Sequence, residues 1–354
     1  MRPNLFDFAP SELSQDAFLC WLLAYADPLH ASDRPAIHAL GREFLALMFA
    51  KDASAPPPTS IQSVRVQRQV EGIDILCVVN GTIAVVIEDK VGTTEHSGQL
   101  DAYSEVVKKL GYDQVGKRIV RIYLQTGNQG SYKRVRDSGY HVVSRLDVLG
   151  LLEGAAGVAA RGGSDIVDAF YVRLSRIETQ VQSFCTAALD SWSAEARMGF
   201  YMALQEVFPE ANWRYVANPG GGLYAFFWHG GEEGEDGCEP YLQIEAEKGR
   251  LDLRIRISTP AGSNASDLRT RWQKKVLAGG AQLGIPVQRP LRNGTGATMT
   301  VALFGGFPCI GAGGVVDVAK SIEVIRRAEG LLKACIAAPA RTNASPTSAE
   351  AVAT

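Results

Sequence analysis

The sequence has no long hydrophobic run, no surplus of charge and no paired cysteine motif. No apolar stretch reaches the roughly 18 residues that a membrane-spanning helix requires, and the start MRPNLFDFAPSEL lacks the features of a signal peptide. The formal net charge is −2, so any contact with a polyanion depends on local basic patches. The six cysteines show no CxxC or CxH spacing, which favours reduced thiols. These absences predict a cytoplasmic protein that does not contact a membrane.

The first 155 residues, by contrast, carry regular patterning. Apolar side chains recur at helical spacing over 11–27 and 34–50, and further helices are expected over 93–111 and 145–154. Alternating or β-branched runs predict strands over 63–70, 72–79, 82–90, 117–127 and 140–144. This order of elements predicts an α/β sandwich with a mixed central sheet.

The pattern of the sequence changes after residue 155. We expect four segments: a first domain over 1–155, a helical connector over 156–209, a smaller α+β domain over 210–337, and a polar, disordered tail over 338–354. In the third segment, charged residues alternate along a predicted hairpin, and cross-strand ion pairs on a solvated face explain them. These residues are Glu245, Glu247, Asp252, Arg254 and Arg256.

Charged residues interrupt two of the predicted strands. Asp74 lies within GIDILCVV, whereas Glu88 and Lys90 end the next strand and share one face of it. Two carboxylates that lie close together repel each other unless a cation sits between them. Mg²⁺, or Mn²⁺, takes oxygen ligands and keeps several waters. Asp74, Glu88 and the backbone carbonyl of Asp89 would supply part of such a shell, with Lys90 facing a phosphate or the attacking water.

The turn at Asn80-Gly81 decides whether these side chains can meet. A plain two-residue turn would leave Asp74 and Glu88 on opposite faces of the sheet. One extra residue brings them onto the same face. A type I turn with Gly81 in the left-handed region would provide it, as would a bulge near Glu88. The metal site therefore requires this register.

The spacing of Asp74 and Glu88-Asp89-Lys90, on a hairpin that precedes a helix, resembles that of the PD-(D/E)XK nuclease superfamily. Ile73 stands where the name of the motif has proline. The following helix holds Gln99 and Tyr103 one turn apart, similar to the Q-x-x-x-Y motif of the exonuclease-like branch.

Glu12, in SELSQDAFLCWLL, is similar to the helical acid that many members of the superfamily place near the metal. The N-terminal segment that contains Glu12 also resembles one bacterial subgroup of the superfamily. The resemblance as a whole covers residues 5–155.

This resemblance implies a restriction-endonuclease-like fold and Mg²⁺-dependent hydrolysis of a nucleic-acid phosphodiester, with DNA favoured over RNA. The implied metal contacts are Asp74, Glu88, Asp89 and Glu12. The implied catalytic residues are Lys90, Glu88, Asp74 and Gln99, and the implied substrate contacts are Tyr103 and Arg121. Arg121 belongs to a basic stretch, 114–136, beside the active strands. The C-terminal domain would contact substrate, a second copy of the chain or a partner protein.

The same residues also admit simpler roles. Lys90 and Asp74 could form a simple buried salt bridge, and Glu12 could serve only the helix dipole. Tyr103 could be a core residue, and the basic stretch a solvated loop face. At the level of the whole protein, the alternatives are a non-cleaving nucleic-acid-binding or scaffold module on the same fold, and an unrelated α/β protein in which the motif arose by chance.

Overall fold

The computed structural model describes residues 3–92, 98–217, 222–229, 234, 236–247, 249–291, 294 and 296–338. The chain divides into two compact units, Met1–Ser183 and Phe184–Thr354. Across the described residues, no helix has both the length and the apolar character needed to cross a bilayer.

The first unit is built on a mixed five-stranded sheet. Its strands lie in chain order: β1 (Val64–Val70), β2 (Ile73–Val79), β3 (Ile83–Lys90), β4 (Arg118–Gln125) and β5 (His141–Ser144). The pairs β1–β2 and β2–β3 are antiparallel, whereas β3–β4 and β4–β5 are parallel. The mixed sheet predicted from the sequence is therefore confirmed.

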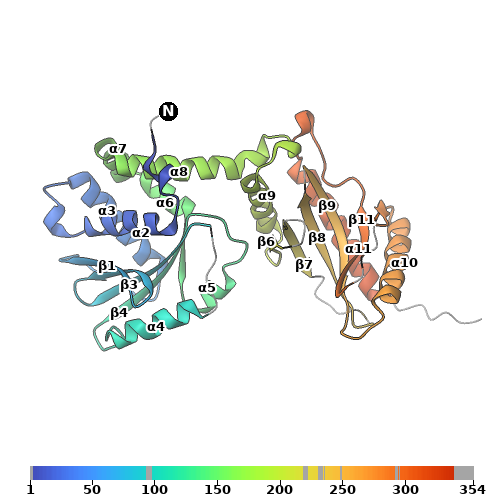
Figure 1. The fold of residues 1–354 in the computed structure, drawn as a ribbon, viewed down its shortest axis with the longest axis horizontal. Coiled ribbons are helices and arrows are strands. Elements are labelled where there is room, and N and C mark those ends of the chain that lie inside the picture. The colour runs from blue at the N-terminus through green and yellow to red at the C-terminus, as the bar shows by residue number, and fades with distance from the viewer. Residues whose placement is uncertain are drawn as a thin grey trace, which may run out of the picture. The chain divides into compact units, whose positions relative to one another are not determined.

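Helices cover both faces of this sheet (Figure 1). On one face, α2 and α3 share a core with α6, α7 and α8, and Phe44 and Phe170 are buried in it. On the other face, α4 buries Tyr103 and Val107 against the strands, and α5 contributes Val135. The helices of this unit are α1 (Leu5–Phe8), α2 (Glu12–Ala24), α3 (Pro35–Lys51), α4 (Gln99–Lys109), α5 (Lys133–Asp137), α6 (Arg145–Glu153), α7 (Ala155–Gly163) and α8 (Asp165–Gln182), with the short 3-10 helix η1 (Pro28–His30).

The β2–β3 hairpin has the register that a shared metal site requires. Val79 pairs with Ile83, so three residues form the loop, and Ile75 pairs with Ile87. One position further along, Asp74 lies across from Glu88. The two carboxylates consequently share one face of the sheet.

The conformation of the turn differs from the expected type I turn. Asn80 and Gly81 both have positive φ, 54° and 68°. Asn80 tolerates this because its side chain is held in place: it accepts from the backbone N–H of Gln62 at 2.7 Å and donates to the carbonyl of Ser60 at 2.9 Å. The helix expected over 93–111 corresponds to α4, Gln99–Lys109, and residues 93–97 of that range fall outside the described residues.

The second unit holds an antiparallel sheet in the order β10-β11-β9-β8-β7-β6. Its helices α9, α10 and α11 share one apolar core with alternate residues of the strands, such as Ile244, Leu253 and Ile255. The elements are α9 (Ala194–Val207), β6 (Asn212–Val216), β7 (Leu223–His229), β8 (Glu239–Glu247), β9 (Arg250–Ser258), α10 (Ala265–Leu283), β10 (Val287–Gln288), β11 (Thr298–Phe304) and α11 (Val318–Ala337), with the 3-10 helices η2 (Ser183–Cys185), η3 (Leu189–Ser191) and η4 (Ala312–Gly314).

The segment expected to connect two domains, 156–209, is divided between the two units. Phe170 and Leu174 of α8 are buried in the core of the first unit, whereas Phe200 and Leu204 of α9 are buried in the core of the second. The unit boundary at Ser183 thus differs from the expected boundaries at 155 and 209, because each of these helices has an apolar face to bury.

Two glycine-to-alanine changes in the first unit should have opposite effects. A Cβ at Gly41 would lie 2.6 Å from the carbonyl oxygen of Leu22, because α2 and α3 pack closely there, whereas a Cβ at Gly150 would meet nothing within 4 Å. We expect Gly41→Ala to destabilise the fold by about 1–3 kcal/mol and Gly150→Ala to stabilise it by about 0.5–1 kcal/mol. Urea denaturation measures both changes. Equal effects would show that helix propensity, and not close packing, governs Gly41.

Candidate active site

Three carboxylates surround one ammonium group at the end of β3. Nζ of Lys90 forms an ion pair with Oε1 of Glu88, and it lies 3.9 Å from Oδ2 of Asp74 and 3.9 Å from Oε2 of Glu12. Glu88 is fully buried, and the side chain of Lys90 is only 6% exposed. The structure therefore gathers these four predicted residues, and Lys90 does more than form a simple pair with Asp74.

Backbone hydrogen bonds fix two of the acids. The N–H of Asp89 donates to Oδ2 of Asp74 at 3.0 Å, which joins β2 to β3 beyond the last paired residues of the hairpin. The N–H of Val91 donates to Oε1 of Glu12 at 3.2 Å, so the first residue of α2 reaches the end of β3. These two bonds hold Asp74 and Glu12 against the end of β3.

Gln99 and Tyr103 lie one helical turn apart on α4, on the same side of the sheet as Glu88. The side-chain amide of Gln99 donates to the hydroxyl of Tyr103 at 2.8 Å. The ring of Tyr103 is buried in a small core with Ile73 and Val86. Burial raises the pKa of Tyr103, and the nearby carboxylate of Glu88 raises it further. The phenol therefore stays protonated and can donate a hydrogen bond at the edge of the cluster.

Arg121 lies on the same face but outside the cluster of acids. Arg121 on β4 lies beside Val86 of β3. Val86 and Glu88 are two residues apart on β3, so they are neighbours on this face of the sheet. Nε of Arg121 donates to the hydroxyl of Ser104 on α4 at 3.3 Å. Arg121 therefore adds positive charge beside the site without neutralising the acids directly.

The electrostatics of the cluster favour an additional cation. Burial raises the pKa of Glu88 from its ordinary value of 4.5 to about 7, and repulsion from Asp74 adds to the effect, although Lys90 partly opposes it. Burial alone would lower the pKa of Lys90, but Glu88, Asp74 and Glu12 together raise it above its ordinary value. Lys90 is thus a stable ammonium that offsets only part of the surrounding negative charge.

Asp89 points its carboxylate to the opposite face, as the alternation of a strand requires. There it accepts from the side-chain amide of Gln15 at 2.6 Å, and Gln15 in turn accepts from the hydroxyl of Thr126 at 2.8 Å. Burial raises the pKa of Asp89 well above its ordinary value, with a further rise from neighbouring Asp16. Only the backbone carbonyl of Asp89 faces the cluster, where it accepts from Nζ of Lys90 at 3.2 Å.

Comparison with known families agrees with this geometry. Residues 3–179, half of the chain, match the family described as the PD-(D/E)XK nuclease superfamily. The chain belongs to this superfamily. Comparisons with curated proteins and with solved structures gave no significant match. The match ends within α8, so membership of the superfamily rests on the first unit.

Four buried polar residues near the PD-(D/E)XK motif are not part of it. Gln15 and Asp16 lie one turn after Glu12 on α2, and that spacing is the signal that could have identified them. Gln125 ends β4 opposite Lys90, and neither polar atom of its side chain has a hydrogen-bond partner within the described residues. Arg145 donates to the carbonyls of Thr126 and Gly127, and no sequence spacing points to this contact.

The donor set fits a divalent cation that prefers oxygen ligands. Oε2 of Glu88 is buried without a hydrogen-bond partner in the described part of the chain, and the side chain of Asp74 is 20% exposed beside it. Among the described residues, no group of three or more His, Cys, Asp or Glu side chains is arranged to hold a metal ion. Asp74, Glu88 and the carbonyl of Asp89 could therefore hold such an ion only in part, and water would complete the shell.

Glu88→Gln should change how stability depends on pH. The raised pKa of Glu88 means that the folded wild type holds a proton that the unfolded chain releases between pH 4.5 and about 7. The contribution of Glu88 to the unfolding free energy therefore falls as pH rises through this window. A glutamine at this position does not titrate, so its contribution stays constant. As pH rises from about 4.5 to 8, the unfolding free energy of Glu88→Gln minus that of wild type should therefore increase by up to about 3 kcal/mol.

Urea denaturation in EDTA at several pH values measures this difference. The exposed acid of an ion pair on α4, Glu105, provides the control, because Glu105→Gln removes a carboxylate that is not buried. A difference between Glu88→Gln and wild type that stays constant with pH would contradict the buried, proton-holding state of Glu88.

Proposed function

We propose that this chain is a metal-dependent nuclease that hydrolyses phosphodiester bonds of nucleic acid, with DNA as the favoured substrate and Mg²⁺ or Mn²⁺ as the cofactor. The observation that carries the proposal is the convergence of Glu12, Asp74 and Glu88 on the ammonium of Lys90. Membership of the PD-(D/E)XK superfamily supplies the reaction class, nuclease chemistry.

Asp74 and Glu88 would hold the metal, with the backbone carbonyl of Asp89 beside them and Glu12 assisting through water. When bound, the metal would polarise the phosphodiester and stabilise the charge that develops on it. The buried position of Glu88 supports this role, because a fully buried carboxylate gains most from a compensating cation.

Lys90 would orient the attacking water and stabilise negative charge in the transition state. The three surrounding carboxylates raise its pKa, so it is an ammonium at neutral pH and cannot accept a proton from water in that state. We therefore assign Lys90 to electrostatic stabilisation rather than to proton abstraction.

Gln99, Tyr103 and Arg121 would contact the phosphate. The hydroxyl of Tyr103 accepts from Gln99 next to the acids. Arg121 lies on the same face beside Val86, the residue that precedes Glu88 on this face of β3. Together they would provide neutral and positive hydrogen-bond donors for an anionic group.

Two substitutions should separate metal binding from catalysis. Lys90→Ala removes the ammonium that competes with a metal for Glu88 and Asp74, so we expect Mn²⁺ to bind at least as tightly as in wild type. Its cleavage rate should nevertheless fall by about a hundredfold or more. Asp74→Ala should lose both metal binding and cleavage. Calorimetric titration with Mn²⁺ and cleavage of plasmid DNA and of RNA with Mg²⁺ measure the two properties.

Lys108→Ala is the matched control, because Lys108 forms an exposed ion pair with Glu105 on α4. It should cleave and bind metal as wild type does. The proposal fails if wild type cleaves neither nucleic acid with Mg²⁺ or Mn²⁺, or if Lys90→Ala cleaves as fast as Lys108→Ala.

A further inference from the structure

The sheet of the second unit has a polar face with a cavity on it. Alternate residues of β8 and β9, among them Leu242, Ile244, Leu253 and Ile255, enter the core with the helices. The intervening residues therefore point to the opposite face. On that face lies a cavity of about 400 Å³, a size typical of small-ligand sites. Its lining includes Val216, Leu223, Gln243, Glu245, Arg254 and Arg256.

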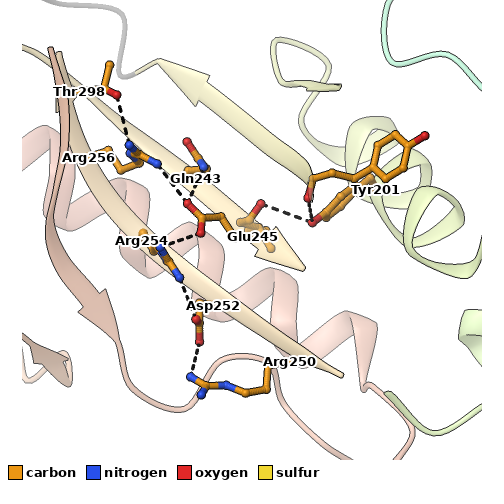
Figure 2. A network of polar contacts seen from close by, with 10 residues as sticks. Tyr201, Gln243, Glu245, Arg250, Asp252, Arg254, Arg256 and Thr298 are labelled. Carbon is orange, nitrogen blue, oxygen red and sulfur yellow. Dashed lines mark hydrogen bonds and ion pairs between the residues drawn. The ribbon is translucent and has the colours of Figure 1, made fainter. Parts of the chain in front are cut away.

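A buried carboxylate holds two arginines at the floor of this cavity (Figure 2). Glu245 accepts from Nη1 of Arg254 at 2.6 Å and from Nη1 of Arg256 at 3.1 Å, and its side chain is only 8% exposed. The side-chain amide of Gln243 donates to the same carboxylate at 2.7 Å. This arrangement differs from the solvated face of simple cross-strand pairs that the alternating charges suggested.

The other Nη atoms of the two arginines are also held. Nη2 of Arg254 contacts Asp252 at 3.0 Å, and Nη2 of Arg256 donates to the hydroxyl of Thr298 at 3.2 Å. Their side chains keep 23% and 20% exposure, and each guanidinium has more N–H donors than these contacts use. Fixed guanidinium groups with remaining donors are preorganised to bind an oxyanion.

The cavity is positively charged and has an apolar side. The network around it holds three guanidinium groups and two carboxylates, which leaves one net positive charge: Arg250, Arg254 and Arg256 against Glu245 and Asp252. Val216 and Leu223, a cross-strand pair of β6 and β7, supply an aliphatic wall. A cationic floor beside an apolar wall complements a molecule with a phosphate next to a flat ring.

We propose that this cavity binds one nucleotide of a single-stranded nucleic acid, with Arg254 and Arg256 donating to the phosphodiester and the Val216–Leu223 pair packing against the base. The choice of nucleic acid rests on the proposed nuclease function of the chain, whereas the anion site rests on the second unit alone. A duplex fits less well, because its bases are stacked and cannot reach the aliphatic wall.

Binding of a fluorescein-labelled oligothymidylate of about 12 nucleotides to the full chain in EDTA tests this site. Fluorescence anisotropy at several salt concentrations measures the affinity without metal-dependent cleavage. We expect the double variant Arg254→Gln/Arg256→Gln to bind about tenfold more weakly. Because both arginines contact one phosphate, their loss should also reduce the slope of log K against log salt by about 0.7.

Glu245→Gln tests the site in the opposite direction, because it removes the carboxylate that competes with the phosphate for both arginines. We expect it to bind the oligonucleotide about threefold more tightly at low salt. Arg326→Gln, which removes an exposed charge from α11, is the control and should bind as wild type does. Thermal melts of every variant verify that the chain remains folded.

The proposal is overturned if the double variant binds as wild type does, or if an unlabelled duplex of the same length competes as well as the single strand. It is also overturned if Glu245→Gln fails to tighten binding, because the network would then serve only the fold. These outcomes are independent of the active site. A wild type that binds as expected but never cleaves refutes the nuclease proposal alone.

Discussion

The register of the β2–β3 hairpin is the constraint on which the candidate active site depends. The three-residue loop pairs Val79 with Ile83, and this pairing carries Asp74 across from Glu88. A shift by one residue would send Glu88 and Lys90 to the opposite face, where α2 and α3 pack. The N–H of Asp89 on β3 donates to the carboxylate of Asp74 on β2, and this hydrogen bond stabilises both the strand pairing and the position of the acid. The site and the fold of this hairpin therefore cannot vary independently.

This arrangement buries carboxylates on the central strand of a well-packed sheet, which is electrostatically unfavourable. Glu88 is fully buried with a raised pKa, and Asp16 and Asp89 on the opposite face have raised pKa values for the same reason, burial first. Such groups reduce stability unless a cation or a proton compensates them. Clusters of this kind are typical of functional sites, where electrostatic strain is retained because the chemistry uses it. In this chain, Lys90 supplies only part of the compensation.

Much of the first unit could be predicted from the sequence, because hydrophobic periodicity sets its helices and strands and the motif spacing sets its charged cluster. The conformation of Asn80 could not be predicted, since contacts with a distant segment hold it. Gln125 and Arg145 were also missed, because their proximity to the site arises from parallel pairing and loop contacts. In the second unit, the alternating pattern predicted the hairpin but not the burial of Glu245, which depends on a neighbouring pair of arginines.

The most direct test of the account is to locate a divalent ion in the protein. Crystals soaked in Mn²⁺ should show an anomalous peak within about 2.5 Å of carboxylate oxygens of both Asp74 and Glu88, with the ammonium of Lys90 displaced from its present contact with Glu88. A structure that shows no peak there, with Lys90 still between the carboxylates at high Mn²⁺ concentration, would contradict the claim that these residues form a metal-dependent hydrolytic site.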